Sequence, residues 1–210
     1  MRAQVSQYGE RSVLIELEQV KPVSVIDSFR SLFPKAEVRS GLNTIVITFP
    51  EISDHTELVE SSLTKVEAVE SSTKTRTLVI ETEYTGEDLE KVCEKLGITR
   101  AKLISAHTAI TWQVALIGFA PGFPYLVPLD ETQKEARLLA QIPRLEVPRA
   151  KVPAGSVAIA SGMSCVYPSS MPGGWNLIGR TEQIFFDLNN HESPALLQAG
   201  DLVRFEELKS

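Results

Sequence analysis

The chain is poor in cysteine and in positive charge, and it has no long apolar run. Its two cysteines, Cys93 and Cys165, are too far apart for a zinc or redox spacing, so we expect a reduced, cytoplasmic protein. A net charge of −6 is the opposite of the basic footprint of nucleic-acid-binding proteins. The most apolar window, residues 114–126, is too short for a membrane span, and the N-terminal residues lack the apolar core of a secretory signal. We therefore expect no nucleic-acid partner and no membrane partner.

Several catalytic signatures are also missing. The chain has no Gly-x-Ser-x-Gly, no P-loop of the form Gly-x-x-x-x-Gly-Lys-Ser/Thr and no zinc-ligand spacing. We therefore predict no metal site. If ATP is used, this chain does not supply a recognisable P-loop for it.

Composition changes midway along the sequence and predicts two domains. Eight of the 12 prolines and seven of the 12 glycines fall within residues 118–180, whereas the first half carries charged, periodic segments. We place the boundary after residue 84. Residues 1–84 would form an α/β domain, and residues 85–210 would form two bridging helices followed by a β-barrel.

The first 84 residues predict alternating strands and helices. Val25, Phe29 and Leu32 recur at helical spacing, and Val59, Leu63 and Val66 would line one face of a second helix. Five segments resemble strands: residues 3–8, 12–17, 37–39, 44–49 and 76–84. The order is β-α-β-β-α-β with an extra strand at the start, which is the ferredoxin-like pattern. A generic α/β sandwich is the alternative.

The second half predicts short strands separated by long loops rich in proline and glycine, as in a closed or nearly closed β-barrel. The predicted strands are residues 111–117, 156–160, 165–167, 183–187 and 201–205. The overall fold class is therefore α+β.

Residues 118–126 (Gly-Phe-Ala-Pro-Gly-Phe-Pro-Tyr-Leu) are the most informative stretch of the chain. Glycine tolerates positive φ, whereas proline fixes φ and removes a donor, so this run specifies one rigid apolar loop. Rigid loops on a scaffold are common places for binding sites, which makes Phe119, Pro121 and Phe123 candidate substrate-binding residues. A well-packed structural corner is the alternative.

Two further segments carry candidate site residues. In residues 143–155, prolines fix an extended path that holds Arg149 and Lys151 on one side, although a solvated basic loop is the alternative. In residues 172–181, the backbone of Gly173 and Gly174 has free N–H groups for an anion. The candidates in that segment are Gly173, Gly174, Trp175 and Arg180. A structural Gly-Gly turn before a buried Trp is the alternative there.

His107 precedes the first predicted strand of the barrel. It is a candidate general acid or base, or an orienting donor, but a helix-end packing role is the alternative. Cys165 has no histidine placed to activate it, and we interpret it as a small core hydrophobe.

Taken together and in order, these elements resemble the subunit-1 family of allophanate-hydrolase-like proteins. That family includes the B component of bacterial 5-oxoprolinase and KipI, an inhibitor of a sporulation histidine kinase. The resemblance is strong over residues 105–205 and weaker before them. The matching elements are His107-Thr108, residues 118–126, Pro148-Arg149, residues 152–157, 167–168, 172–175 and 178–181, and Pro194 with residues 200–205. The chain departs from the usual pattern at Trp112 and at residues 161–166, which bears on substrate specificity rather than on the fold.

The resemblance implies a ferredoxin-like N-terminal domain, a cyclophilin-like C-terminal barrel and a second subunit as partner. In the 5-oxoprolinase case, such a complex opens 5-oxoproline to L-glutamate with ATP hydrolysis, and the chain alone would be inactive. ATP would be bound together with the partner. His107, Lys151 and Arg180 would be catalytic. Arg149, Lys151 and Arg180 would clamp a carboxylate, and Gly173 with Gly174 would stabilise an oxyanion.

Two other functions stay open at this point. One is a KipI-type inhibitor that binds a sporulation histidine kinase. The other is subunit 1 of a urea- or allophanate-processing amidolyase-carboxylase. Family folds host several functions, so the sequence alone does not separate these three.

Overall fold

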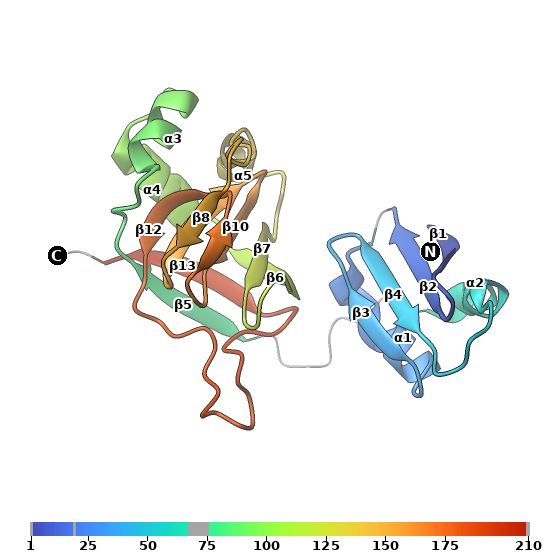
Figure 1. Ribbon diagram of the computed structural model, residues 1–210. Helices are drawn as coiled ribbons and strands as arrows, with labels where there is room; N and C mark the ends of the chain where they lie inside the picture. The colour runs from blue at the N-terminus through green and yellow to red at the C-terminus, as the bar shows by residue number, and fades with distance from the viewer. Residues whose placement is uncertain (1, 19, 67–75, 209–210) are drawn as a thin grey trace. The chain divides into compact units, whose positions relative to one another are not determined.

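The structure, a computed structural model, describes residues 2–18, 20–66 and 76–208 (Figure 1). The chain divides into two compact units, Met1–Thr75 and Arg76–Ser210. Each unit has its own hydrophobic core. The architecture is α+β, as predicted.

The first unit is a four-stranded antiparallel sheet with two helices. The sheet order is β1-β2-β4-β3. Alternation places Val13, Ile15, Ile45 and Ile47 in a core that Phe29 of the first helix completes. The elements are β1 (Ala3–Tyr8), β2 (Ser12–Leu17), α1 (Ile26–Leu32), β3 (Glu37–Ser40), β4 (Thr44–Thr48) and α2 (Thr56–Ser62), with short 3₁₀ turns at Pro22–Ser24 and Leu63–Lys65.

The ferredoxin-like prediction assigned the wrong fourth strand to this sheet. Strand β5 (Thr77–Thr82) does not join it; it pairs in parallel with β13 (Leu202–Glu207) in the second unit. Instead, β1 lies on the outer side of β2, where the last strand of a ferredoxin-like order would stand. The domain boundary therefore falls at Thr75/Arg76 and not after residue 84. The alternating pattern of β5 predicts a strand but does not reveal which strand it pairs with.

The second unit is built on a seven-stranded sheet that curls into a nearly closed barrel. Its order is β12-β9-β10-β7-β6-β13-β5, and a backbone bridge between Glu83 and Arg180 joins its two edges. Strands β8 and β11 form a separate small ladder. The remaining elements are α3 (Leu89–Leu96), α4 (Arg100–Ala109), β6 (Trp112–Ile117), β7 (Pro124–Pro128), α5 (Lys134–Leu139), β8 (Arg149–Val152), β9 (Ser156–Ala160), β10 (Met163–Val166), β11 (Met171–Gly173) and β12 (Asn176–Arg180).

One predicted strand of this unit is wrong, and four of its strands, β7, β8, β11 and β12, were not predicted. Residues 183–187 form an irregular loop with one isolated bridge, Phe186 to Ala195. Conversely, the predicted loop 118–126 ends in β7, because Tyr125 and Leu126 pair with β6. Proline bounds both ends of that strand, and this disguised it in the sequence. In the described part of the chain, no helix is long and apolar enough to cross a membrane.

Candidate functional site

The three segments singled out in the sequence meet in one aromatic cluster of the second unit. The ring of Phe123 lies 5.2 Å from that of Tyr167 and 6.4 Å from that of Trp175, both edge-to-face. Val152 and Leu177 pack in the same cluster. Residues 118–126, 149–155 and 173–180 therefore converge, as their shared proline and glycine content predicted.

Phe123 and Trp175 are both buried, so they form the packed interior of this cluster and do not line an open cavity. The guanidinium of Arg144 lies 5.7 Å from the centre of the Trp175 ring, in cation–π contact. By contrast, Phe119 is 68% exposed and holds a positive φ of 71° at the tip of the β6–β7 turn. Pro121 beside it is also exposed.

The glycine pair has a structural role in this geometry. A Cβ on Gly173 would overlap the Tyr167 hydroxyl, so only glycine fits there. Gly173 pairs with Arg149 across the β8–β11 ladder, and the Gly174 carbonyl accepts a hydrogen bond from the Leu145 N–H at 2.7 Å. This supports the structural-turn alternative for the pair. An oxyanion role stays a prediction.

Arg149 is held in a buried ion pair. Its Nη2 atom lies 2.7 Å from each carboxylate oxygen of Asp88, and Asp88 is 1% exposed. The Asp88 carboxylate also accepts a 2.8 Å hydrogen bond from the Leu177 N–H. Arg149 thus connects the start of α3 to β8 and β12, and its charge is already neutralised by a protein carboxylate. This geometry favours a structural role over a substrate clamp.

His107 lies in the barrel core and not on a cavity wall. Its Nδ1 is 2.7 Å from the Tyr84 hydroxyl and its Nε2 is 2.9 Å from the Ser164 hydroxyl. Burial lowers the pKa of His107 to about 3, so the ring is neutral at physiological pH. Its ring centre also lies 4.4 Å from that of Phe205. The structure therefore gives His107 a packing and hydrogen-bonding position.

The two remaining catalytic candidates are exposed. Lys151 lies in β8, and its side chain contacts no ion-pair or hydrogen-bond partner among the described residues. Arg180 ends β12 and pairs with Glu182 and, at 3.7 Å, with Glu83. Arg180 lines two cavities of the second unit, and neither His107 nor Lys151 is among the residues that line them with it.

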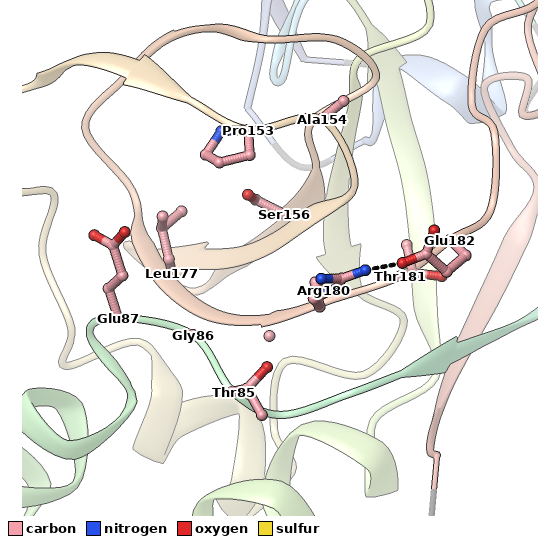
Figure 2. A pocket seen from close by; sticks show the side chains of 11 residues that line it. Thr85, Gly86, Glu87, Pro153, Ala154, Ser156, Leu177, Arg180, Thr181 and Glu182 are labelled. Carbon is pink, nitrogen blue, oxygen red and sulfur yellow. Dashed lines mark hydrogen bonds and ion pairs between the residues drawn. The ribbon is translucent and has the colours of Figure 1, made fainter.

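Arg180 borders a cavity of about 350 Å³ that is the best candidate site (Figure 2). Three pieces of chain form its walls: the loop after β5, the turn between β8 and β9, and β12. The lining residues are Thr85, Gly86, Glu87, Pro153, Ala154, Ser156, Leu177, Gly179, Arg180, Thr181 and Glu182. Two of the motifs that carry the family resemblance, residues 152–157 and 178–181, therefore line it side by side, because Ser156 pairs with Arg180 between β9 and β12.

Close backbone packing fixes the shape of this cavity. Gly155 has a φ of +77°, and a Cβ there would overlap the Thr181 carbonyl oxygen. The Thr181 N–H donates to the Gly155 carbonyl at 2.8 Å. Opposite them, a Cβ on Gly86 would overlap the Leu177 carbonyl oxygen. Such contacts make a rigid site, which is the property that binding pockets need.

Ser156 is the most informative side chain in the cavity, although its sequence context did not by itself predict a role for it. The residue is only 6% exposed, yet its hydroxyl makes no hydrogen bond within the described part of the chain. No buried side-chain nitrogen or oxygen of the described residues lacks a partner, so this hydroxyl is open to the cavity, where a ligand atom can reach it. Thr85 and Thr181 add hydroxyls, while Arg180, Glu87 and Glu182 add charges of both signs. The cavity suits a small polar molecule that carries both donors and acceptors.

Comparison with known proteins identifies the family. The model for "Carboxyltransferase domain, subdomain C and D" matches residues 3–197, and the chain belongs to this family. The chain is 34% identical to the B component of 5-oxoprolinase from Escherichia coli O157:H7, over 97% of this chain and 95% of that protein. It is 44% identical to the B component of 5-oxoprolinase from Haemophilus influenzae over 57% of this chain and 53% of that one. The family predicted from the sequence motifs is thus confirmed.

Solved structures share the fold. A protein named TTHA0988 superposes with a TM-score of 0.76 at 26% identity, over 95% of this chain but only 40% of its own length. Urea carboxylase of Kluyveromyces lactis superposes with a TM-score of 0.74 at 16% identity, over 99% of this chain and 22% of its own. The chain therefore corresponds to less than half of each of these two proteins.

Proposed function

We propose that this chain is the B component of a cytoplasmic 5-oxoprolinase complex, which opens the cyclic amide of 5-oxoproline to L-glutamate with ATP hydrolysis. The observation that carries the proposal is the 34% identity with the B component of a 5-oxoprolinase along nearly the whole of both chains. In this proposal the barrel is cyclophilin-like, a second subunit completes the enzyme, and the chain alone is inactive.

The 350 Å³ cavity supports the proposal through its chemistry. A small cyclic amide with a carboxylate needs a cation for the acid and hydroxyl groups for the amide N–H and carbonyl. Arg180 offers the cation and the free Ser156 hydroxyl offers an amide partner, and both face the same cavity (Figure 2). Binding would compete with the Glu182 and Glu83 carboxylates for Arg180. The role assigned to this chain is to bind and orient the substrate.

The residues around this cavity do not fit a nucleoside triphosphate. Arg180 is the lone cation among the lining residues, and Glu87 and Glu182 would repel a polyphosphate. Among the described residues, no group of three or more His, Cys, Asp or Glu side chains is placed to hold a metal ion. We therefore propose that ATP binds with the partner protein, and we assign no step of its chemistry to residues of this chain.

A second candidate function is a subunit of a urea- or allophanate-processing enzyme. A 98-residue stretch is 26% identical to a putative urea carboxylase of Emericella nidulans. That match covers 47% of this chain and 8% of that protein, so the 5-oxoprolinase proposal has the broader support.

Steady-state kinetics of the complex reconstituted with its second subunit would test the assignment of the cavity. Ser156→Ala removes the free hydroxyl, and we expect the KM for 5-oxoproline to rise about tenfold with unchanged thermal stability, the loss typical of one hydrogen bond. Ser105→Ala, which removes an exposed hydroxyl on α4, is the matched control. Equal KM values for the two variants and the wild type would remove Ser156, and with it this cavity, from substrate binding.

A further inference from the structure

The barrel has one open edge, and it lies along β5. The strand order ends at β5, whose inner neighbour is β13. The bridge from Glu83 to Arg180 joins β5 to β12 at one point only. Beyond that point the chain leaves the sheet, and residues 181–184 line the same groove as Val79 and Glu81.

The backbone direction along β5 shows which groups are free. The carbonyls of Arg76 and Thr82 accept hydrogen bonds from Leu202 and Leu208 at 2.9 Å each, so even-numbered residues face β13. Glu83 faces the other way, toward Arg180. By alternation, the N–H and C=O groups of Thr77, Val79 and Glu81 point to the open edge, where no described backbone group pairs with them.

A groove of about 650 Å³ runs beside this edge, and exposed apolar side chains line it. Val79 is 44% exposed, Ile184 64% and Leu208 51%. Unpaired strand edges with apolar neighbours are liable to take up another strand, and soluble proteins usually protect them. Here the nearby protection is charge, because Glu81, Glu83, Glu182 and Glu206 line the same groove. Arg180 is the only cation among its described lining residues, and Arg204 of β13 lies beside Val79 in the strand pairing.

We propose that the open edge of β5 binds a β-strand of another polypeptide, one that alternates apolar with basic side chains. Its backbone would pair with Thr77, Val79 and Glu81. Its basic side chains would lie on the exposed face of the sheet, the face that carries Glu81 and Glu206. Its apolar side chains would lie on the opposite face, the face of the buried Ile80. A second copy of this chain is a poor occupant, because pairing two β5 edges would bring two acidic grooves together. That the strand belongs to a second enzyme subunit rests on the proposed function; the preference for a basic strand does not.

The position of this edge connects it to the candidate site. Arg180, Thr181 and Glu182 line both the groove and the 350 Å³ cavity. A strand bound at β5 would therefore lie against the arginine proposed to bind the substrate.

Residue-resolved hydrogen exchange tests the proposal without any activity assay. The probe is a nine-residue peptide that alternates lysine and valine, and the control peptide alternates glutamate and valine. In the free protein, we expect the amides of Val79 and Glu81 to exchange fast and those of Leu78 and Ile80 slowly. The lysine peptide should slow exchange at Val79 and Glu81 at least tenfold, and the glutamate peptide should not.

Substitutions in β5 test whether the peptide binds at this edge. Val79→Pro deletes an outward N–H and should abolish peptide binding while Leu78 and Ile80 stay protected, because proline is tolerated on edge strands. Glu81→Lys should weaken lysine-peptide binding at least tenfold, whereas Glu94→Lys on α3 should not. This pair of variants tests the interface if the proline variant does not fold.

The proposal is overturned if the lysine peptide does not bind, if both peptides bind equally, or if protection appears elsewhere. It is also overturned if β5 is protected in a dimer of the protein alone. Each outcome is independent of whether the complex hydrolyses 5-oxoproline.

Discussion

The Nη2 atom of Arg149 lies 2.7 Å from both carboxylate oxygens of Asp88, and this pair links three elements of the second unit. Asp88 precedes α3, Arg149 begins β8, and the Leu177 N–H of β12 donates to the same carboxylate. Glu87 and Leu177, the chain neighbour and the hydrogen-bond partner of Asp88, both line the candidate cavity. The pair therefore holds two walls of the cavity in place.

Breaking this pair should destabilise the protein strongly. We expect Asp88→Ala to lower the free energy of unfolding by about 3–5 kcal/mol, because it leaves Arg149 without its buried partner. The exposed pair Glu37–Arg39 is the control, and Glu37→Ala should cost less than about 1 kcal/mol. Urea unfolding of both variants measures the difference. Equal midpoints would mean that the Asp88–Arg149 pair contributes no more than a surface pair.

Acid should destabilise the protein through His107. Its pKa is about 3 in the folded chain and about 6.5 when unfolded, so between these values the unfolded state binds more protons. Stability should therefore fall as pH drops through this range, by about 2 kcal/mol between pH 7.5 and pH 5 from this residue. Urea titrations of wild type and His107→Gln test this. Between pH 7.5 and pH 5, the free energy of unfolding of His107→Gln should fall by about 2 kcal/mol less than that of wild type. His191→Gln, at an exposed site, should behave as wild type. Parallel pH profiles for His107→Gln and wild type would contradict the buried neutral state.

Gly155 should be much less tolerant of a side chain than another glycine of the same conformation. Gly155 and Gly97 both have positive φ, but a Cβ on Gly97 would meet nothing within 4 Å, whereas one on Gly155 would overlap the Thr181 carbonyl. Gly97→Ala should therefore cost about 1 kcal/mol from backbone strain alone. Gly155→Ala should cost roughly 2 kcal/mol more, because the carbonyl must shift. Thermal unfolding of both variants gives the comparison, and equal losses would show that the turn adapts without cost.

Lys151 stays a predicted catalytic residue, and its exposure allows a clean test. Lys151→Ala should leave the melting temperature nearly unchanged, because exposed substitutions usually change stability by less than about 0.5 kcal/mol. In the reconstituted complex we expect the rate to fall by tens to hundreds of fold, the loss of about 2–4 kcal/mol of transition-state stabilisation. Lys91→Ala, at an exposed site on α3, is the control. A stable, fully active Lys151→Ala complex would make Lys151 a solvated surface residue of β8 with no catalytic role.

Local patterns predicted most elements, but not how strands pair over long distances. The periodicities of residues 12–17 and 44–48 were sufficient for strands β2 and β4, because one face of each is buried. The same kind of pattern in β5 did not show that its neighbour lies more than 120 residues later in the chain. Pairing partners depend on the whole chain, and local propensity carries no information about them.

The candidate site was predicted only in part for a similar reason. Residue type suggested Arg149 as a clamp, but the carboxylate that neutralises it comes from Asp88, 61 residues earlier. Ser156 was overlooked because a serine in a strand pattern is ordinary until its burial and its free hydroxyl are known. The motif Pro-Ala-Gly-Ser at residues 153–156 was the available signal, since a turn fixed by Pro and Gly aims the following side chain.

The most direct test of the proposed function is the formation of L-glutamate from 5-oxoproline by the chain mixed with its second subunit. We predict ATP-dependent glutamate production by the mixture and none by either protein alone. A mixture that leaves 5-oxoproline intact, or one that hydrolyses ATP only when urea or allophanate is supplied, would contradict it.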